Sequence, residues 1–417
     1  MDVREFSRSQ SRSGTRQHLA TWLGVSLLAF ALVLILLTRH PAARVNGTQA
    51  VPASPPDSMV FTVWYVDDES FGTSLKMAHV VGKQGNRRLE DVKTLLQIDN
   101  SESINEFAVS PSQDSVLVSA NPSVPFLTNV SQLWLISTNR KRRVIRSDMA
   151  GYINLRWSGN ESLISYISNE GASQGSGDTD SPVPENLYIH NLATNKRARV
   201  MMDTYKAEWI PVTDVLASTS LTKTGIRLST FNGKHSTIES GTQGGTLVLS
   251  QDGTSLLVND IGYLGGYRLT KGKHADEARG WQLVHEYSIP WEPEAAALSS
   301  DGRFLALSVL AFGMSPREPR QLAILDLQEG LGKMFGTIAG PVHRLKWSSD
   351  GRYLLYTSYS RAGRDEIPLF RLSAMSVASG HWVPVQAMDW SALSAAKPTE
   401  IIRFPPKARQ VEWREDK

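Results

Sequence analysis

Seven short segments of this chain resemble one another, and their spacing constrains the fold more than any single residue does. Six of them run from an apolar stretch through a polar turn into a second apolar stretch, as in EAAALSSDGRFLALSV (294–309) and GTLVLSQDGTSLLVN (245–259), and the seventh is truncated before the turn. The apolar residue before the turn serves as an anchor, and the anchors are Val109, Trp157, Trp209, Leu249, Leu298, Trp347 and Trp413. Adjacent anchors are 40 to 66 residues apart. A repeat of this length, containing strand, tight turn and strand, is typical of a β-propeller, so the sequence predicts an all-β fold.

Each repeat should supply a four-stranded blade whose innermost strand carries the anchor. The C-terminal ARQVEW (408–413) supplies an inner strand only, whereas the N-terminal MVFTVWYV (59–66) looks like a second strand without its first. Joining the two ends completes a seventh blade and removes an exposed sheet edge. We therefore expect seven blades closed by pairing of the N- and C-terminal strands, with six blades and a dispensable tail as the alternative.

A stretch near the N-terminus carries no formal charge. Residues 19–38 read LATWLGVSLLAFALVLILLT, which is long enough to cross a bilayer core of ~30 Å. No good cleavage site follows, so we expect an uncleaved anchor rather than a secretory signal. Arginines before the span outnumber those close behind it, which places the N-terminus in the cytoplasm and the remainder outside. The predicted order is a cytoplasmic stub (1–18), a transmembrane helix (19–38), a proline-containing tether (39–58) and the propeller (59–417).

Composition limits the cellular compartments and the classes of partner that the chain can have. The chain has no cysteine, which excludes disulfides and thiolate metal sites. An exported domain of this size without cysteine favours a bacterial envelope, so we expect a single-pass protein of the bacterial cytoplasmic membrane. The formal net charge is +3 and the basic residues are dispersed, so we predict no nucleic-acid partner.

Two copies of the repeat resemble those of a known family. LSSDGRFLALS (298–308) and WSSDGRYLLYTS (347–358) are similar to the repeats of TolB-type propellers, with the same apolar residue, Ser-x-Asp-Gly turn and apolar return strand. The likeness extends over residues 59–417 and is weakest where PVTD (211–214) replaces the turn pattern. The resemblance implies a periplasmic, non-catalytic binding role in the envelope. The chain departs from the family pattern by its membrane anchor and by lacking a separate N-terminal domain.

Several residue patterns bear on whether the chain carries a catalytic or metal site. GASQG (171–175) matches a nucleophile elbow, but it sits in a linker-like stretch without the required strand and helix. The histidines show no metal-ligand spacing. Asp252, Asp301 and Asp350 recur at equivalent turns, so we interpret them as acceptors of backbone hydrogen bonds there. The recurring anchor tryptophans indicate packing between blades. We therefore predict no catalytic residue, no metal and no cofactor.

Function should lie in the loops that join second to third strands and one blade to the next, because these emerge on one face of a propeller. The predicted partner-binding residues there are Phe126, Phe312, Arg317, Arg320, Tyr359, Arg361, Arg364 and Trp390. Aromatic residues and arginines are favoured at protein interfaces. The leading hypothesis is a membrane-tethered, non-enzymatic, extracytoplasmic propeller that acts as a binding or scaffold module for a protein or envelope component. The alternatives are a propeller hydrolase or lyase with a central-pocket site, and a transmembrane sensor.

Overall fold

The structure is a computed structural model that describes residues between Phe61 and Glu415. The stretches inside that range that it leaves undescribed are 70–71, 83–87, 100–102, 122–130, 149–150, 169, 171–185, 261–262, 290–291, 311–319, 339–341, 349–350, 352, 361–368, 377–380, 386–387, 389–399 and 404–407. The predicted stub, transmembrane helix and tether also lie outside the described residues. Within the described ranges, no helix has the length and apolar content that crossing a bilayer requires. Apart from the 3-10 helix η1 (Ala278–Gly280), the regular elements there are strands, which confirms the all-β class.

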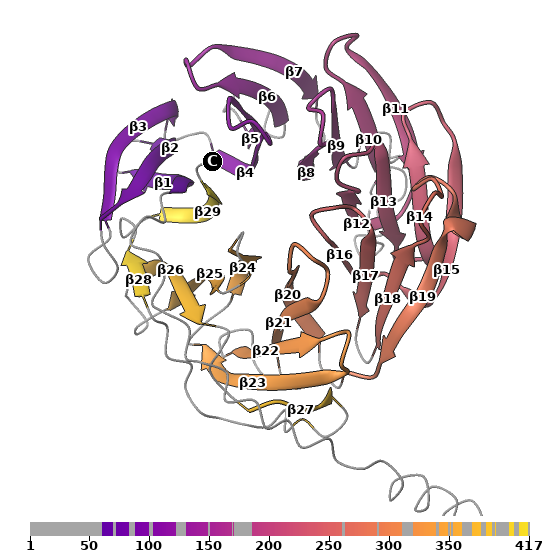
Figure 1. The fold of residues 1–417 in the computed structure, drawn as a ribbon. Helices are drawn as coiled ribbons and strands as arrows, with labels where there is room; N and C mark the ends of the chain where they lie inside the picture. Colours follow the sequence, from indigo (N-terminus) through magenta and orange to yellow (C-terminus); the bar gives the residue numbers. More distant parts are fainter. Residues whose placement is uncertain are drawn as a thin grey trace, which may run out of the picture. The chain divides into compact units, whose positions relative to one another are not determined.

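The described strands form seven antiparallel sheets, one for each repeat, in a propeller-like arrangement (Figure 1). The sheet containing both ends of the described chain consists of β29 (Ala408–Glu415), β1 (Phe61–Glu69), β2 (Gly72–Val81) and β3 (Arg88–Asp99). The β4 sheet consists of β4 (Ser103–Val109), β5 (Ser115–Asn121), β6 (Ser131–Ser137) and β7 (Arg142–Asp148). The β8 sheet consists of β8 (Tyr152–Trp157), β9 (Leu163–Ser168), β10 (Asn186–Asn191) and β11 (Lys196–Met201).

The other four sheets are likewise named by their first strand. The β12 sheet consists of β12 (Thr204–Trp209), β13 (Val215–Ser220), β14 (Thr224–Thr230) and β15 (His235–Gln243). The β16 sheet consists of β16 (Thr246–Leu249), β17 (Ser255–Asp260), β18 (Tyr263–Leu269) and β19 (Trp281–Tyr287). The β20 sheet consists of β20 (Glu292–Leu298), β21 (Phe304–Leu310), β22 (Arg320–Asp326), β23 (Leu331–Ile338) and β27 (Val383–Pro384). The β24 sheet consists of β24 (Val342–Trp347), β25 (Tyr353–Ser360), β26 (Leu369–Ser376) and β28 (Glu400–Arg403).

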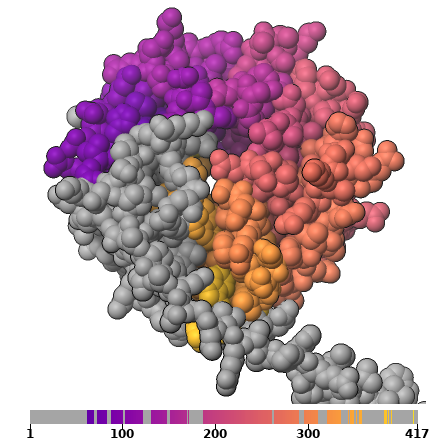
Figure 2. All heavy atoms as spheres, viewed as in Figure 1, coloured from indigo at the N-terminus to yellow at the C-terminus, as the bar shows by residue number. Residues whose placement is uncertain are grey.

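The strand that carries the anchor lies innermost in each sheet, and successive inner strands contact one another, from β4 and β8 through to β20 and β24. The sheets follow one another in sequence order (Figure 1), and Figure 2 shows the colours running from indigo to orange around one face of the single unit Ala53–Lys417. Apolar side chains fill the space between neighbouring sheets, as where Trp64 of β1 and Phe107 of β4 share one cluster. The anchor Trp347 is buried, and its Nε1 donates to Ala297 O of the preceding sheet at 2.9 Å. The predicted packing between sheets is confirmed for this tryptophan.

A buried serine holds the polar turn that follows most inner strands. After β16, Ser250 Oγ donates to Asp252 Oδ1 at 2.5 Å and accepts the backbone N–H five residues later at 2.9 Å. Asp252 Oδ1 also accepts the backbone N–H two residues later at 3.0 Å. After β20, Ser299 and Asp301 repeat these contacts, with Oγ to Oδ1 at 2.6 Å. The structural role predicted for the two aspartates is confirmed, whereas Asp350 lies outside the described residues.

The turn after β12 closes the same hairpin with different residues. Ile210 replaces the serine, and Thr213 Oγ1 donates to Ile210 O at 2.8 Å and accepts from Val215 N at 3.2 Å. The positive φ that Gly302 supplies in the β20 sheet, at 70°, falls here on Val212, at 58°. A β-branched residue is strained in that region of φ. The departure in sequence therefore changes the side-chain contacts of the turn and leaves the hairpin in place.

The two ends of the described chain pair in one sheet. β29 runs antiparallel to β1, with Val63 opposite Trp413 and Tyr65 opposite Val411. The register then shifts, so that Gln410 has no partner residue in β1. The C-terminal strand thus occupies the inner position for which the N-terminal repeat has no strand of its own.

One sheet contains a fifth strand that the repeat pattern does not predict. β27 pairs with the outer strand β23, placing Pro384 opposite Leu331. The fourth strand of the β24 sheet is β28, which pairs with β26. Residues 400–403, which follow β27 in the sequence, thus supply the outer strand of the β24 sheet. The physical reason is that the outer strand of a sheet has unpaired backbone N–H and C=O groups, which can form hydrogen bonds with any extended segment nearby. β27 therefore pairs with the β20 sheet before the chain adds β28 to the β24 sheet.

Candidate functional site

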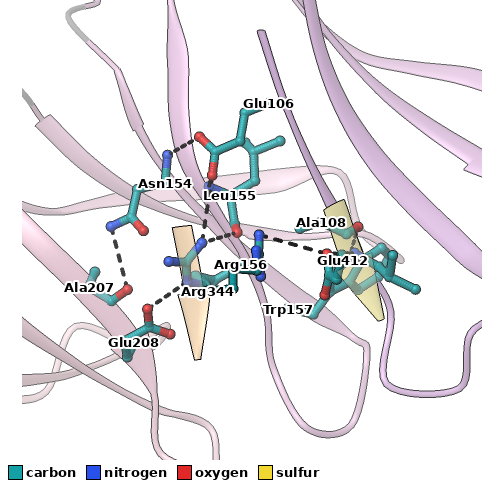
Figure 3. Close-up of polar contacts among 11 residues, drawn as sticks. Glu106, Ala108, Asn154, Leu155, Arg156, Trp157, Ala207, Glu208, Arg344 and Glu412 are labelled. Carbon is teal, nitrogen blue, oxygen red and sulfur yellow. Dashed lines mark hydrogen bonds and ion pairs between the residues drawn. The ribbon is translucent and has the colours of Figure 1, made fainter. Parts of the chain in front are cut away.

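Five charged side chains project from the inner strands of five different sheets. They are called the inner charge network and comprise Glu106 (β4), Arg156 (β8), Glu208 (β12), Arg344 (β24) and Glu412 (β29). Figure 3 shows them beside one another in two groups, with Arg156 joined to Glu106 and Glu208, and Arg344 joined to Glu412. Because inner strands converge, charges from repeats far apart in the sequence meet here.

Arg156 is the centre of the network. Its Nε donates to Glu208 Oε1 at 2.7 Å, and its Nη1 lies 3.6 Å from Glu106 Oε1. Nη1 also donates to Leu155 O at 2.8 Å. One guanidinium therefore links the β4, β8 and β12 sheets, with the fork geometry that suits arginine to two carboxylates.

Two carboxylates of the network accept backbone N–H groups from a neighbouring sheet. Glu106 accepts from Asn154 N at 2.6 Å and from Leu155 N at 3.2 Å. These donors are free of ladder bonds because the β8–β9 register shifts at this point. Glu412, which is 6 % exposed, accepts from Val109 N at 3.2 Å. Glu106 thus satisfies backbone donors that the bulge in β8 leaves unpaired, and Glu412 accepts one from the end of β4.

Electrostatics keeps the network charged. Burial opposes the charge of Arg156, yet Glu208 and Glu106 outweigh that effect, so the pKa of Arg156 is raised above its usual value. A permanently protonated guanidinium is no proton donor for catalysis. No group of three or more His, Asp or Glu that could hold a metal occurs in the part of the chain that the structure describes. The arrangement is suited to holding sheets together.

A second ion-pair cluster lies at the end of β9. Glu170 Oε1 accepts from Arg197 Nη2 at 2.6 Å and lies 3.5 Å from Arg146 Nη2. The hydrogen bond from Arg197 lowers the pKa of the Glu170 carboxyl, with the charge of Arg146 adding to it against the effect of burial. Arg197 also stacks over Tyr188, 4.9 Å from the ring centroid. This cluster joins the β4 and β8 sheets away from the inner strands.

The loop face is the end of the sheets opposite the anchor turns, where second and third strands and successive sheets are joined. In the β12 sheet its two connections touch, since Leu221 N donates to Asp203 O at 3.0 Å and Thr222 Oγ1 to Asp203 Oδ2 at 3.3 Å. Three apolar side chains are exposed here: Met202 (52 %), Leu221 (53 %) and Tyr205 (37 %). We call them the loop-face patch. Grouped exposed apolar residues are a feature of binding surfaces.

A cleft opens beside this patch, between β11 of the β8 sheet and β14 and β15 of the β12 sheet. Its volume is about 280 Å³, and Met202 lines it as well. Three cationic residues line it, Arg199, Lys223 and Arg227, and no acidic residue does. The Nε of Arg227 is buried without a hydrogen-bond partner among the described residues. We call this the cationic cleft.

Most of the predicted partner-binding residues cannot be compared with the structure. Phe126, Phe312, Arg317, Arg361, Arg364 and Trp390 lie outside the described residues. Tyr359 belongs to strand β25, opposite Phe370, rather than to the loop expected there. Arg320 is also not in an exposed loop: it begins β22 opposite Ile338 and is 1 % exposed. The exposed position expected for Arg320 was wrong because β22 extends to the end of its neighbour β23 and encloses this residue.

Sequence reasoning missed the loop-face patch and the cationic cleft. Leu221 is an isolated apolar residue in a polar connection, and Met202 directly follows the apolar residues Val200 and Met201, so neither gives a strong sequence signal of exposure. Arg199 and Arg227 sit in strands of two different repeats. Only the packing of one sheet against the next brings them to one cleft, so no spacing in the sequence could have indicated it.

Comparisons with known proteins assign no family to the chain. No family model and no curated protein matches it. Solved structures similar to it include a functionally unknown protein from Desulfotomaculum acetoxidans DSM 771, with 11% identity, a TM-score of 0.46, and 82% of this chain and 98% of that chain covered. Oligogalacturonate lyase in complex with manganese has 10% identity and a TM-score of 0.46, covering 72% and 93%. Kuenenia stuttgartiensis hydrazine synthase has 10% identity and a TM-score of 0.43, covering 65% and 75%. At these levels the similarities assign neither activity nor ligand to this chain.

Proposed function

We propose that this chain is a membrane-tethered, non-enzymatic binding module that holds a protein or envelope component on its loop face, outside the cytoplasm. One observation carries the proposal. The described part of the loop face exposes Met202, Tyr205 and Leu221 together, whereas the charges of the inner strands contact one another. Exposed apolar surface with cations at its edge is available to a partner, and a network of paired charges is not.

The scaffold of this module is proposed to be a seven-bladed propeller closed by its own ends. The pairing of β29 with β1 supports this, as do the contacts of β26 with β29 and of β28 with β3. These contacts lie where the last sheet meets the first. A closed ring leaves no inner sheet edge open and gives the loops a rigid base.

The position in the cell is proposed from the sequence. The uncharged span 19–38 would anchor the module in the bacterial cytoplasmic membrane, with the stub 1–18 inside and the propeller outside. The resemblance to TolB-type repeats supports a role in the envelope. A tether of about twenty residues would let the loop face reach a partner near the membrane surface.

Site-specific photo-crosslinking in intact cells tests the proposal. A photoreactive residue at Leu221, on the loop face, is expected to give a discrete adduct with an envelope protein or glycan. The same residue at Val212 is the matched control, because Val212 is apolar and 82 % exposed but lies at the anchor turn of the same sheet. Equal labelling from both positions, or none from Leu221, would reject the loop face as the binding surface.

A further inference from the structure

The cationic cleft carries unpaired positive charge. Its three cations come from three backbone segments: Arg199 from β11, Lys223 from the β13–β14 connection and Arg227 from β14. None of the three makes an ion pair or a side-chain hydrogen bond with another described residue. Like charges that converge without counter-charge repel one another, so the arrangement is costly unless something negative enters.

Arg227 shows the need for an acceptor most clearly. Its Nε is buried and unpartnered among the described residues. The guanidinium of Arg146, by contrast, meets the carboxylate of Glu170 at 3.5 Å. No such carboxylate serves Arg227 in the described chain: Glu239, two residues beyond the lining residue Thr237, does not line the cleft. A buried donor without an acceptor costs its full desolvation free energy, because no hydrogen bond replaces those it made to water.

We propose that the cationic cleft binds an oxyanion group, the phosphate or sulfate of the component held on the loop face. This inference rests on the proposed function and names the chemistry of its ligand. Two planar guanidinium groups with an ammonium match a tetrahedral oxyanion that carries up to two charges, because each arginine can donate to two oxygens. The hydroxyls of Thr224 and Thr237, which also line the cleft, can donate to a further oxygen.

The size and position of the cleft agree with this ligand. About 280 Å³ accommodates a phosphate ester with a small attached group rather than a large cofactor. Met202 belongs to both the cleft and the loop-face patch, so the uncharged remainder of a ligand would extend over apolar surface. A phosphate group on a larger envelope molecule therefore fits better than a free ion.

Calorimetric titration of the full-length protein in detergent, at constant ionic strength in chloride, provides the test. The probes are inorganic phosphate, glycerol 3-phosphate and glycerol. We expect saturable binding of both phosphates and none of glycerol, with glycerol 3-phosphate the tighter of the two. If inorganic phosphate bound more tightly than glycerol 3-phosphate, the cleft would be a site for free phosphate, and the proposal that the phosphate belongs to a larger component would be wrong. Failure of both phosphates to bind would overturn the proposal.

Two variants and one control locate the binding. Arg227→Met is expected to weaken phosphate binding about 10-fold or more, and Lys223→Met about 3-fold, because each removes a charged donor. Lys223 is exposed, so its variant remains informative if Arg227→Met fails to fold. Lys196→Met removes an exposed cation at the far end of β11 and should bind as the parent does. Unchanged phosphate binding by folded Arg227→Met and Lys223→Met would show that the anion binds outside the cationic cleft, which would overturn the proposal. Crosslinking at Leu221 is read independently, so failure of this site and failure of the loop face are distinguishable.

Discussion

Arg156, in the inner strand β8, and Arg227, in the third strand β14, have opposite surroundings. Both lie in strands, at the junction of two sheets. Arg156 has the carboxylates of Glu208 and Glu106 at 2.7 and 3.6 Å. Arg227 has no carboxylate partner in the described chain. A charge whose partners are built into neighbouring sheets stabilises the assembly of those sheets, whereas a charge without partners retains its capacity to bind something else.

The strongest way to break the inner network is to remove β29. Deleting residues 408–417 removes the inner strand of one sheet and the contacts of Glu412 with Val109 and Arg344. The loss should exceed the ~3–5 kcal/mol of a single broken buried ion pair, a large part of the ~5–15 kcal/mol that stabilises many domains. We expect aggregation or a much lower Tm, measured by thermal unfolding and size-exclusion chromatography.

Glu412→Gln is the matched control for that deletion. It keeps the strand and removes only the charge, so its loss of stability should be about 1–3 kcal/mol. A deletion variant as stable as the parent would show that β29 is dispensable and would contradict the proposed closure by the two ends.

The sign of the stability change separates the two arginines. Arg156→Met leaves two carboxylates without their cation and should reduce the free energy of unfolding by about 2 kcal/mol, less than for a fully buried pair because Arg156 is 30% exposed. Arg227→Met removes an unpaired buried donor and should leave the free energy unchanged or raise it by up to ~1 kcal/mol. Denaturant unfolding of both variants measures this. Equal destabilisation would mean that Arg227 is as well paired as Arg156.

Lys333 sharpens the comparison with a buried cation that stacks on an aromatic ring. It is 1 % exposed, its Nζ lies 4.5 Å from the ring centroid of Trp382, and burial lowers its pKa to about 8. Between pH 8 and about 10.5 the unfolded chain therefore holds this proton and the folded chain does not, so stability should rise with pH in that window. The rise should reach at most ~1.4 kcal/mol per pH unit. Unfolding curves at pH 7.5 and 9.5 measure it, and a Lys333→Met variant with the same pH dependence would contradict it.

Local features of the fold were predictable from the sequence. The serine and aspartate of the repeated turn bond to backbone groups no more than five residues away, as in Ser250 and Asp252. The pairing partner of the last strand was also predictable, because β29 and β1 were the incomplete ends of one pattern. β27 was not predictable. Two residues are too few to show a hydrophobic alternation, and their pairing depends on which sheet edge lies nearby in the folded protein.

The sequence by itself therefore determined the repeat, its strands and turns, and the all-β class, because hydrophobic alternation and turn chemistry act between near neighbours. Only the tertiary structure decided which charges are paired. Arg156 and Glu208 are 52 residues apart and meet through the packing of two inner strands. Arg199 and Arg227 converge on one cleft because the outer strand β11 of one sheet packs beside β14 and β15 of the next. Coulomb attraction depends on distance in space, and in a chain of repeats that distance is set by how the sheets lie against one another.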